Sequence, residues 1–146
     1  MTAFSQIHAF LVGRLKDSPA VAGGRVYSNR DLRRIPEGYP DYVVVRQERT
    51  RRDRGVLGVL DWQTLYLVEC YGRTVAVQSA DDAVDGLIQA VVSRLELPAD
   101  AGLGIAAVDV ADEVEWVRDD AETTMTCAAI QVLVRHRTDS SLQPVA

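Results

Sequence analysis

The sequence predicts an α+β fold: a two-layer sandwich in which two helices cover one face of a mostly antiparallel sheet of four or five strands. Two segments carry apolar residues at helical spacing, and several others are rich in valine or alternate between polar and apolar residues, as strands do. The connections between the strand segments are short, which favours antiparallel neighbours. The 146 residues suit a single domain, residues 1–146, with its core within about 3–137.

The first predicted element is a helix over about residues 3–16. Its apolar residues recur at steps of three and four and form one stripe: Phe4, Ile7, Leu11 and Leu15. His8 lies in the same stripe, so we interpret it as a packed or interface histidine. A short strand around residues 25–28 follows, and then a loop over residues 29–40 that contains two prolines and a glycine.

The middle of the chain predicts two strands joined by a long arm. Residues 41–48 include the run Tyr-Val-Val-Val, which favours a strand. Residues 49–60 form the arginine-rich arm, which we expect to be a mobile hairpin; its charged residues include Arg49, Arg51, Arg52 and Arg54. Residues 62–71 are apolar on both faces, so this strand is expected near the centre of the sheet.

The second half predicts a helix and two further strands. Ser79 is expected to cap a helix that Pro98 ends. A strand over residues 108–117 carries several acids and should be poorly buried, whereas residues 124–137 form the strongest strand. The remaining expectations concern single residues and the end of the chain: Cys70 and Cys127 buried and reduced, His136 solvated at a strand end, and a polar tail over residues 138–146.

Charge is distributed unevenly along the chain. The net charge is −5, which argues against a protein that coats DNA generically. Residues 25–61 nevertheless hold nine arginines against six acids, whereas residues 79–122 hold twelve acids against two arginines. One part of the molecule could therefore attract the opposite part of a second copy.

Motifs for catalysis or cofactor binding are missing from the sequence. It contains no phosphate-binding loop, dinucleotide fingerprint, serine-nucleophile elbow or HExxH pair, and only two histidines. We expect no catalytic residue, no cofactor and no metal; a magnesium or calcium site built from the carboxylate runs is a lesser alternative. The longest uncharged stretch is thirteen residues, so no membrane span or signal peptide is expected, and the protein should fold in the cytoplasm.

Three interpretations of the arginine-rich arm remain open. It could be a solvated loop kept soluble by its charge, an arm that contacts phosphate groups, or an arm that meets the acidic part of a neighbouring subunit. The arm holds no aromatic residue on which a base could stack, which disfavours recognition of single-stranded nucleic acid.

Three segments together carry a resemblance to a known family. They are YPDYVVV at residues 39–45, LDWQTLYLVECY at residues 60–71 and EWVRDDAETTMTCAAIQVLVRHR at residues 115–137. In this order and spacing the chain resembles the tail terminator proteins of long-tailed phages, of the phage lambda minor tail protein U type. The family pattern is more acidic where this chain carries its arginine-rich arm.

The resemblance implies a structural protein without a reaction, encoded by a phage or a prophage. Such proteins form a ring of identical subunits, a hexamer by resemblance, which caps the tail tube, ends tail polymerisation and provides the head-joining surface. The implied partners are further copies, the tail tube protein and the head-tail joining protein, with DNA only passing through the ring. The implied location is the virion tail, and the host cytoplasm during assembly.

A charged interface between subunits is expected on this basis. We expect its basic side to be Arg49, Arg51, Arg52 and Arg54, and its acidic side to be Asp119, Asp120 and Glu122. The alternative function is a small nucleic-acid-binding module or neck (head-tail connector) module that uses the arginine-rich arm. An enzyme with a carboxylate site is a third and weaker hypothesis.

Overall fold

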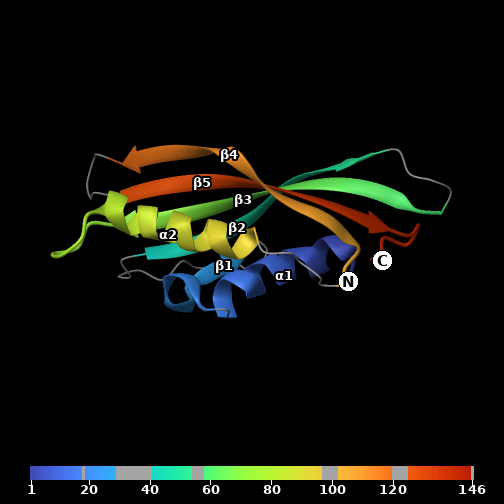
Figure 1. The fold of residues 1–146 in the computed structure, drawn as a ribbon, viewed down its shortest axis with the longest axis horizontal. Helices are drawn as coiled ribbons and strands as arrows, with labels where there is room; N and C mark the ends of the chain where they lie inside the picture. The colour runs from blue at the N-terminus through green and yellow to red at the C-terminus, as the bar shows by residue number, and fades with distance from the viewer. Residues whose placement is uncertain (18, 29–40, 54–57, 97–101, 120–124, 146) are drawn as a thin grey trace.

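The chain folds as two helices and one five-stranded sheet, which confirms the predicted α+β class (Figure 1). The computed structural model describes residues 1–17, 19–28, 41–53, 58–96, 102–119 and 125–145. Its elements are α1 (Ala3–Asp17), a 3-10 turn (Val21–Gly24), β1 (Val26–Ser28), β2 (Asp41–Arg52), β3 (Leu60–Arg73), α2 (Ala80–Leu95), β4 (Ile105–Asp119) and β5 (Met125–Thr138).

The strand order is β1-β2-β3-β5-β4. β1 pairs with β2 in parallel, and all other neighbours are antiparallel. β3 therefore lies at the centre of the sheet, as its two apolar faces predict. The longest ladder joins β3 to β5 and runs without a shift from Leu60 paired with Thr138 to Arg73 paired with Met125.

Both helices pack on the same face of the sheet and share one core with it (Figure 1). The apolar stripes of α1 and α2 meet alternate residues of the central strands, and the fully buried side chains include Ile7, Leu11, Val84, Tyr66, Val68, Ile130 and Val132. Ser79 caps α2 as predicted, because its side chain accepts a hydrogen bond from the backbone N–H of Asp82 (3.1 Å). We call this side of the sheet the covered face and the other side the open face.

The prediction that His136 is solvated is wrong. This residue is 2% exposed on the covered face, where its Nε2 lies 2.9 Å from the hydroxyl of Thr64 and its ring meets Phe4 of α1 edge-on. His8 is buried as expected, with its Nε2 2.7 Å from the hydroxyl of Ser28. Both histidines thus belong to the contact between α1 and the sheet.

The predicted arm over residues 49–60 is also wrong at both of its ends. Arg49–Arg52 continue β2 and pair with β3, and the backbone N–H of Asp53 donates to the carbonyl of Asp61 (2.8 Å). These ladder hydrogen bonds stabilise an extended backbone in spite of the clustered charge. Residues 54–57, which include Arg54, lie outside the described residues, as does the loop predicted over residues 29–40.

The end of the chain, expected as a polar tail, folds back on the sheet. Thr138 is the last residue of β5 and is fully buried, and Pro144 forms a β-bridge with it. The carbonyl of Leu142 accepts a hydrogen bond from the backbone N–H of Ala3 (2.8 Å), so the two ends of the chain lie together (Figure 1). Residues 139–145 therefore help to hold the start of α1 against the sheet.

Candidate functional site

The second half of β2 is a strand edge on which arginines gather. β1 pairs with Val43–Val45 only, and no other described strand pairs with the outer side of β2 beyond that point. The outer residues are Arg49, Arg51 and Arg52, all of them exposed. None of the three forms an ion pair with a described residue. We call these three arginines the basic surface.

A β-bulge decides which way these arginines point. The register of β2 against β3 shifts between Gln47, which pairs with Tyr66, and Arg49, which pairs with Leu65. One extra residue, Glu48, reverses the alternation of side chains along the strand. Because of this reversal, Arg49 and Arg51 lie on the open face, while Thr50 lies on the covered face and its hydroxyl is 3.0 Å from that of Thr64. Arg52 pairs with Trp62 and therefore lies on the covered side of the same edge.

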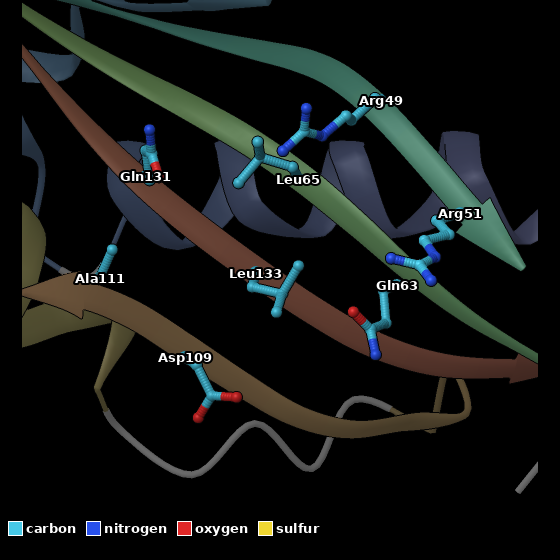
Figure 2. Close-up of a pocket in the computed structure, with 8 residues that line it drawn as sticks. All are labelled: Arg49, Arg51, Gln63, Leu65, Asp109, Ala111, Gln131 and Leu133. Atoms are coloured by element: carbon cyan, nitrogen blue, oxygen red, sulfur yellow. The ribbon is translucent and has the colours of Figure 1, made fainter. Parts of the chain in front are cut away.

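The open face is hollowed beside these arginines into a groove of about 660 Å³ (Figure 2). Eight residues from four strands line it: Arg49, Arg51, Gln63, Leu65, Asp109, Ala111, Gln131 and Leu133. One row crosses the sheet in register, from Arg49 through Leu65 and Leu133 to Asp109. The groove therefore has a basic wall on β2, an apolar floor on β3 and β5, and one carboxylate on β4.

Exposed carboxylates gather on the other side of the molecule. They come from the first turns of α2 and from the edge strand β4: Asp82, Asp85, Asp112, Glu113 and Glu115. None of them forms an ion pair with a described residue, and we call them the acidic surface. α2 and β4 are joined there by Asp81, which pairs with Arg118 and accepts a hydrogen bond from the hydroxyl of Thr126 (2.7 Å). The Thr126 hydroxyl, followed by the Arg118 guanidinium, lowers the pKa of Asp81.

The predicted interface residues that the structure describes lie at opposite ends of the sheet. Arg52 pairs with Trp62 near the start of β3, whereas Asp119 pairs with Met125, which itself pairs with Arg73 at the end of β3. Eleven residues of extended strand separate these ends, or roughly 35 Å. Arg49, Arg51 and Arg52 therefore lie together, apart from Asp119; Arg54, Asp120 and Glu122 lie outside the described residues.

The rest of the open face is occupied by contacts within the subunit. Arg46 pairs with Glu69, which also accepts a hydrogen bond from the hydroxyl of Tyr71 (2.8 Å). The ring of Tyr71 stacks on Tyr42 at 4.7 Å, and burial followed by the Glu69 hydrogen bond raises the pKa of Tyr71. These partners leave Arg46 bound within the fold, in contrast to Arg49 and Arg51 further along the same strand.

The two cysteines lie on neighbouring strands but face opposite sides of the sheet. Cys70 is fully buried on the covered face, and this burial raises the pKa of its thiol to about 12. Cys127 pairs with Tyr71 on the open face and is half-buried, so the expectation of burial is met fully by Cys70 and only partly by Cys127. Cys70 is therefore a core residue rather than a reactive thiol.

Sequence reasoning missed six lining residues of the groove: Gln63, Leu65, Asp109, Ala111, Gln131 and Leu133. The acids of residues 108–117 indicated a poorly buried strand, and residues 62–71 were predicted to be apolar on both faces. Which of these residues would stand beside Arg49 depends on the order of β3, β5 and β4, and the sequence pattern does not contain that order.

Over the described ranges, no three histidine, cysteine or acidic side chains come together as a metal site would require. Within the same ranges, no helix has the length and apolar character needed to cross a membrane. No family model matches the chain, and no curated protein matches it significantly in sequence. Its function is therefore argued from the charged surfaces and the groove.

Proposed function

We propose that this protein is a structural subunit, not an enzyme, that assembles head to tail with copies of itself into a ring. The observation that carries the proposal is the separation of the basic surface from the acidic surface. Each carries exposed charges without ion-pair partners among the described residues. The strands β3 and β5 lie between the arginines of β2 and the acids of β4. These charges are left for a second molecule to neutralise.

The same separation favours a head-to-tail contact between copies over a surface that pairs with itself. A two-fold dimer that pairs a surface with itself would bring arginine against arginine, which costs free energy. A head-to-tail contact instead brings the basic surface of one copy against the acidic surface of the next. Head-to-tail contacts continue from copy to copy until the rotation closes a ring. Exposed ion pairs contribute only about 0–1 kcal/mol each, so they set the register while apolar contacts stabilise the ring.

The resemblance to phage tail terminators supports a specific role for such a ring. We propose that it caps the tail tube, ends tail polymerisation and offers a surface to the head-joining protein, with DNA passing through its centre. On this proposal the ring is a hexamer that forms in the host cytoplasm and ends in the virion tail. The resemblance itself depends on the three sequence segments named above; the predicted α+β class of the fold is observed.

The nucleic-acid alternative is less well supported by the groove. Arg49 and Arg51 could each bind a phosphate oxygen, but Asp109 lies across the same row of residues. A carboxylate repels a phosphate backbone that follows the groove. A neighbouring protein subunit, which carries both acidic and apolar groups, suits this lining better.

Two variants that fail alone and assemble together would test the head-to-tail contact. We expect the parent to sediment as a multiple of the 16.0 kDa chain. Arg51→Glu/Arg52→Glu places acid against acid, and Glu113→Arg/Glu115→Arg places base against base, so each variant alone should remain monomeric. In a mixture every contact again joins opposite charges, so a ring of alternating subunits should form.

The control changes charge away from the proposed contact. Lys16→Glu, at an exposed position on α1, should assemble like the parent. A parent that stays monomeric at every concentration would contradict the proposal. So would an Arg51→Glu/Arg52→Glu variant that assembles normally but loses binding to duplex DNA, and that result would favour the nucleic-acid module.

A further inference from the structure

The turn between β3 and α2 presents an apolar tip to solvent. The backbone N–H of Val75 donates to the carbonyl of Gln78 (2.9 Å), and the N–H of Gln78 donates back to Val75 (3.2 Å). The two residues between them form the tip, where Val77 is 95% exposed; Val75 itself is 39% exposed. The turn is closed by these hydrogen bonds and followed at once by the capped start of α2, so the valine is held in a defined position.

The groove on the open face offers an apolar surface that could cover the exposed valine. Its floor consists of Leu65 and Leu133, which are only half-buried in the single subunit. Burying a half-exposed leucine against another apolar side chain is favourable, since it removes apolar area from water. Figure 2 shows Leu65 and Leu133 between Arg51 on β2 and Asp109 on β4.

The tip and the groove cannot meet within one chain. The turn follows Arg73 at the end of β3, and Leu65 lies eight residues earlier on the same strand. That separation is about 25 Å, and the turn extends beyond the end of the strand rather than back along it (Figure 1). Only the turn of a second copy can reach the groove, and a head-to-tail arrangement brings opposite ends of two copies together.

Charge complementarity agrees with this pairing. Asp81 and Asp82 follow the turn at the start of α2, and Asp81 is already bound to Arg118 and Thr126. The side chain of Asp82 has no partner among the described residues and is exposed. The groove likewise carries Arg49 and Arg51 without ion-pair partners in the described part of the chain. A copy that inserts its turn brings the unpaired carboxylate towards the unpaired guanidinium groups.

We propose that the Val75–Val77 turn of one subunit docks into the open-face groove of the next, with Val77 on Leu65 and Leu133 and with Asp82 facing Arg49 and Arg51. This inference rests on the proposed head-to-tail assembly and identifies its apolar anchor. It also explains why one subunit exposes Val77 and leaves Leu65 and Leu133 only half-buried, since all three are covered in the assembly.

Disulfide trapping tests the contact directly. In a Cys127→Ser background, in which the remaining Cys70 is fully buried, one variant carries Val77→Cys and a second carries Leu133→Cys. Oxidation of the mixture should give a covalent dimer of twice the 16.0 kDa chain. A mixture of Val77→Cys with Gln89→Cys, an exposed position on α2, is the matched control and should give little of that product.

Substitution of the tip supplies an independent measurement. Val77→Asp should raise the concentration at half-assembly at least tenfold with an unchanged melting temperature of the subunit, whereas Val77→Ile should assemble like the parent. Ala9→Asp, on the exposed side of α1, controls for the added charge.

The outcomes separate this inference from the function on which it rests. If Val77→Asp assembles normally and no Val77–Leu133 product forms, while Arg51→Glu/Arg52→Glu still blocks assembly, the docking is wrong and the head-to-tail assembly stands. If the parent is monomeric at all concentrations, both proposals are overturned.

Discussion

The two faces of the sheet are built from the same strands but differ in how far their side chains are buried and paired within the subunit. On the covered face, alternate residues of β3 and β5 are fully buried under the helices, and even polar members such as Thr64 and His136 have partners there. On the open face, Leu65 and Leu133 stay half-buried and Arg49 and Arg51 have no ion-pair partner among the described residues. The covered face is complete in one subunit, whereas the open face is completed by a second molecule on our proposal. Substitutions on the two faces of one strand can test that difference.

The largest contrast is expected between two positions of β3, three residues apart, that face opposite sides of the sheet. Val68→Asp places an unpaired carboxylate in the core and should cost about 3–5 kcal/mol or prevent folding. Leu65→Asp lies in the groove, where water reaches the new carboxylate, so the subunit should fold and lose assembly instead. Urea unfolding followed by circular dichroism, with sedimentation of the folded variant, measures both effects. Equal destabilisation by the two substitutions would show that the open face is core as well.

Low pH should destabilise the folded subunit through His136, which is buried on the covered face. Burial lowers the pKa of His136 to about 4, from the 6.5 of a histidine exposed to solvent. The unfolded chain therefore binds a proton that the folded chain does not between these values. Above pH 6.5 His136 is neutral in both states and does not lower the free energy of unfolding. As the pH falls from 6.5 towards 4, the free energy of unfolding decreases by about 1.4 kcal/mol per pH unit.

Comparison of the parent with His136→Gln isolates that contribution from those of other titrating groups. The variant should be less stable near pH 7 but show a shallower loss of unfolding free energy between pH 6.5 and pH 4. Parallel stability curves for the two proteins would mean that His136 is protonated in the fold without penalty.

A matched pair of glycines tests how tightly the helical layer lies on the sheet. A Cβ at Gly72 on β3 would lie 2.8 Å from the backbone oxygen of Ala80 and 2.9 Å from a methyl group of Val84. Gly72→Ala should therefore destabilise the subunit by about 1–3 kcal/mol, since α2 must shift. Gly86→Ala, on α2 with open space around it, should instead stabilise by about 0.5–1 kcal/mol. Thermal unfolding of both variants gives the comparison.

The smallest expected effect separates two arginines of β2. Arg46 pairs with Glu69, so Arg46→Gln should cost up to about 1 kcal/mol of subunit stability. Arg51 has no ion-pair partner among the described residues, so Arg51→Gln should leave subunit stability within about 0.5 kcal/mol while it weakens assembly. Salt should reduce the assembly of the parent for the same reason, with little effect on unfolding. A stability loss at Arg51 as large as that at Arg46 would indicate a partner for Arg51 inside the subunit.

The prediction of the fold class succeeded because its signals are local. The stripe of α1, the valine run of β2 and the capping serine of α2 each act over a few residues, and the folded chain keeps all three elements. The burial of Cys70 was also predictable, since it lies in a strand with apolar residues on both faces. The opposite charge of two long segments can be counted directly in the sequence.

The site could be predicted only in part. Arg49, Arg51 and Arg52 were named, but as a mobile arm, because clustered charge and nearby glycines are equally typical of loops. His136 was misplaced for a related reason: flanking arginines indicate solvent, whereas the residue itself alternates inward and meets Phe4, which is distant in sequence. The strand conformation of Arg49–Arg52 and the burial of His136 both depend on contacts with residues far away in the sequence.

The sequence by itself determined which segments are helix or strand, which stripes are apolar and which segments are basic or acidic. Only the tertiary structure decided that Glu48 is the extra residue of a bulge and that Asp109 stands across the sheet from Arg49. Alternation along a strand is encoded by adjacent residues, but register and strand order depend on hydrogen bonds to strands far away in the chain. A shift of one residue in β2 would turn Arg49 and Arg51 towards the core, so the groove exists because long-range pairing placed them on the open face.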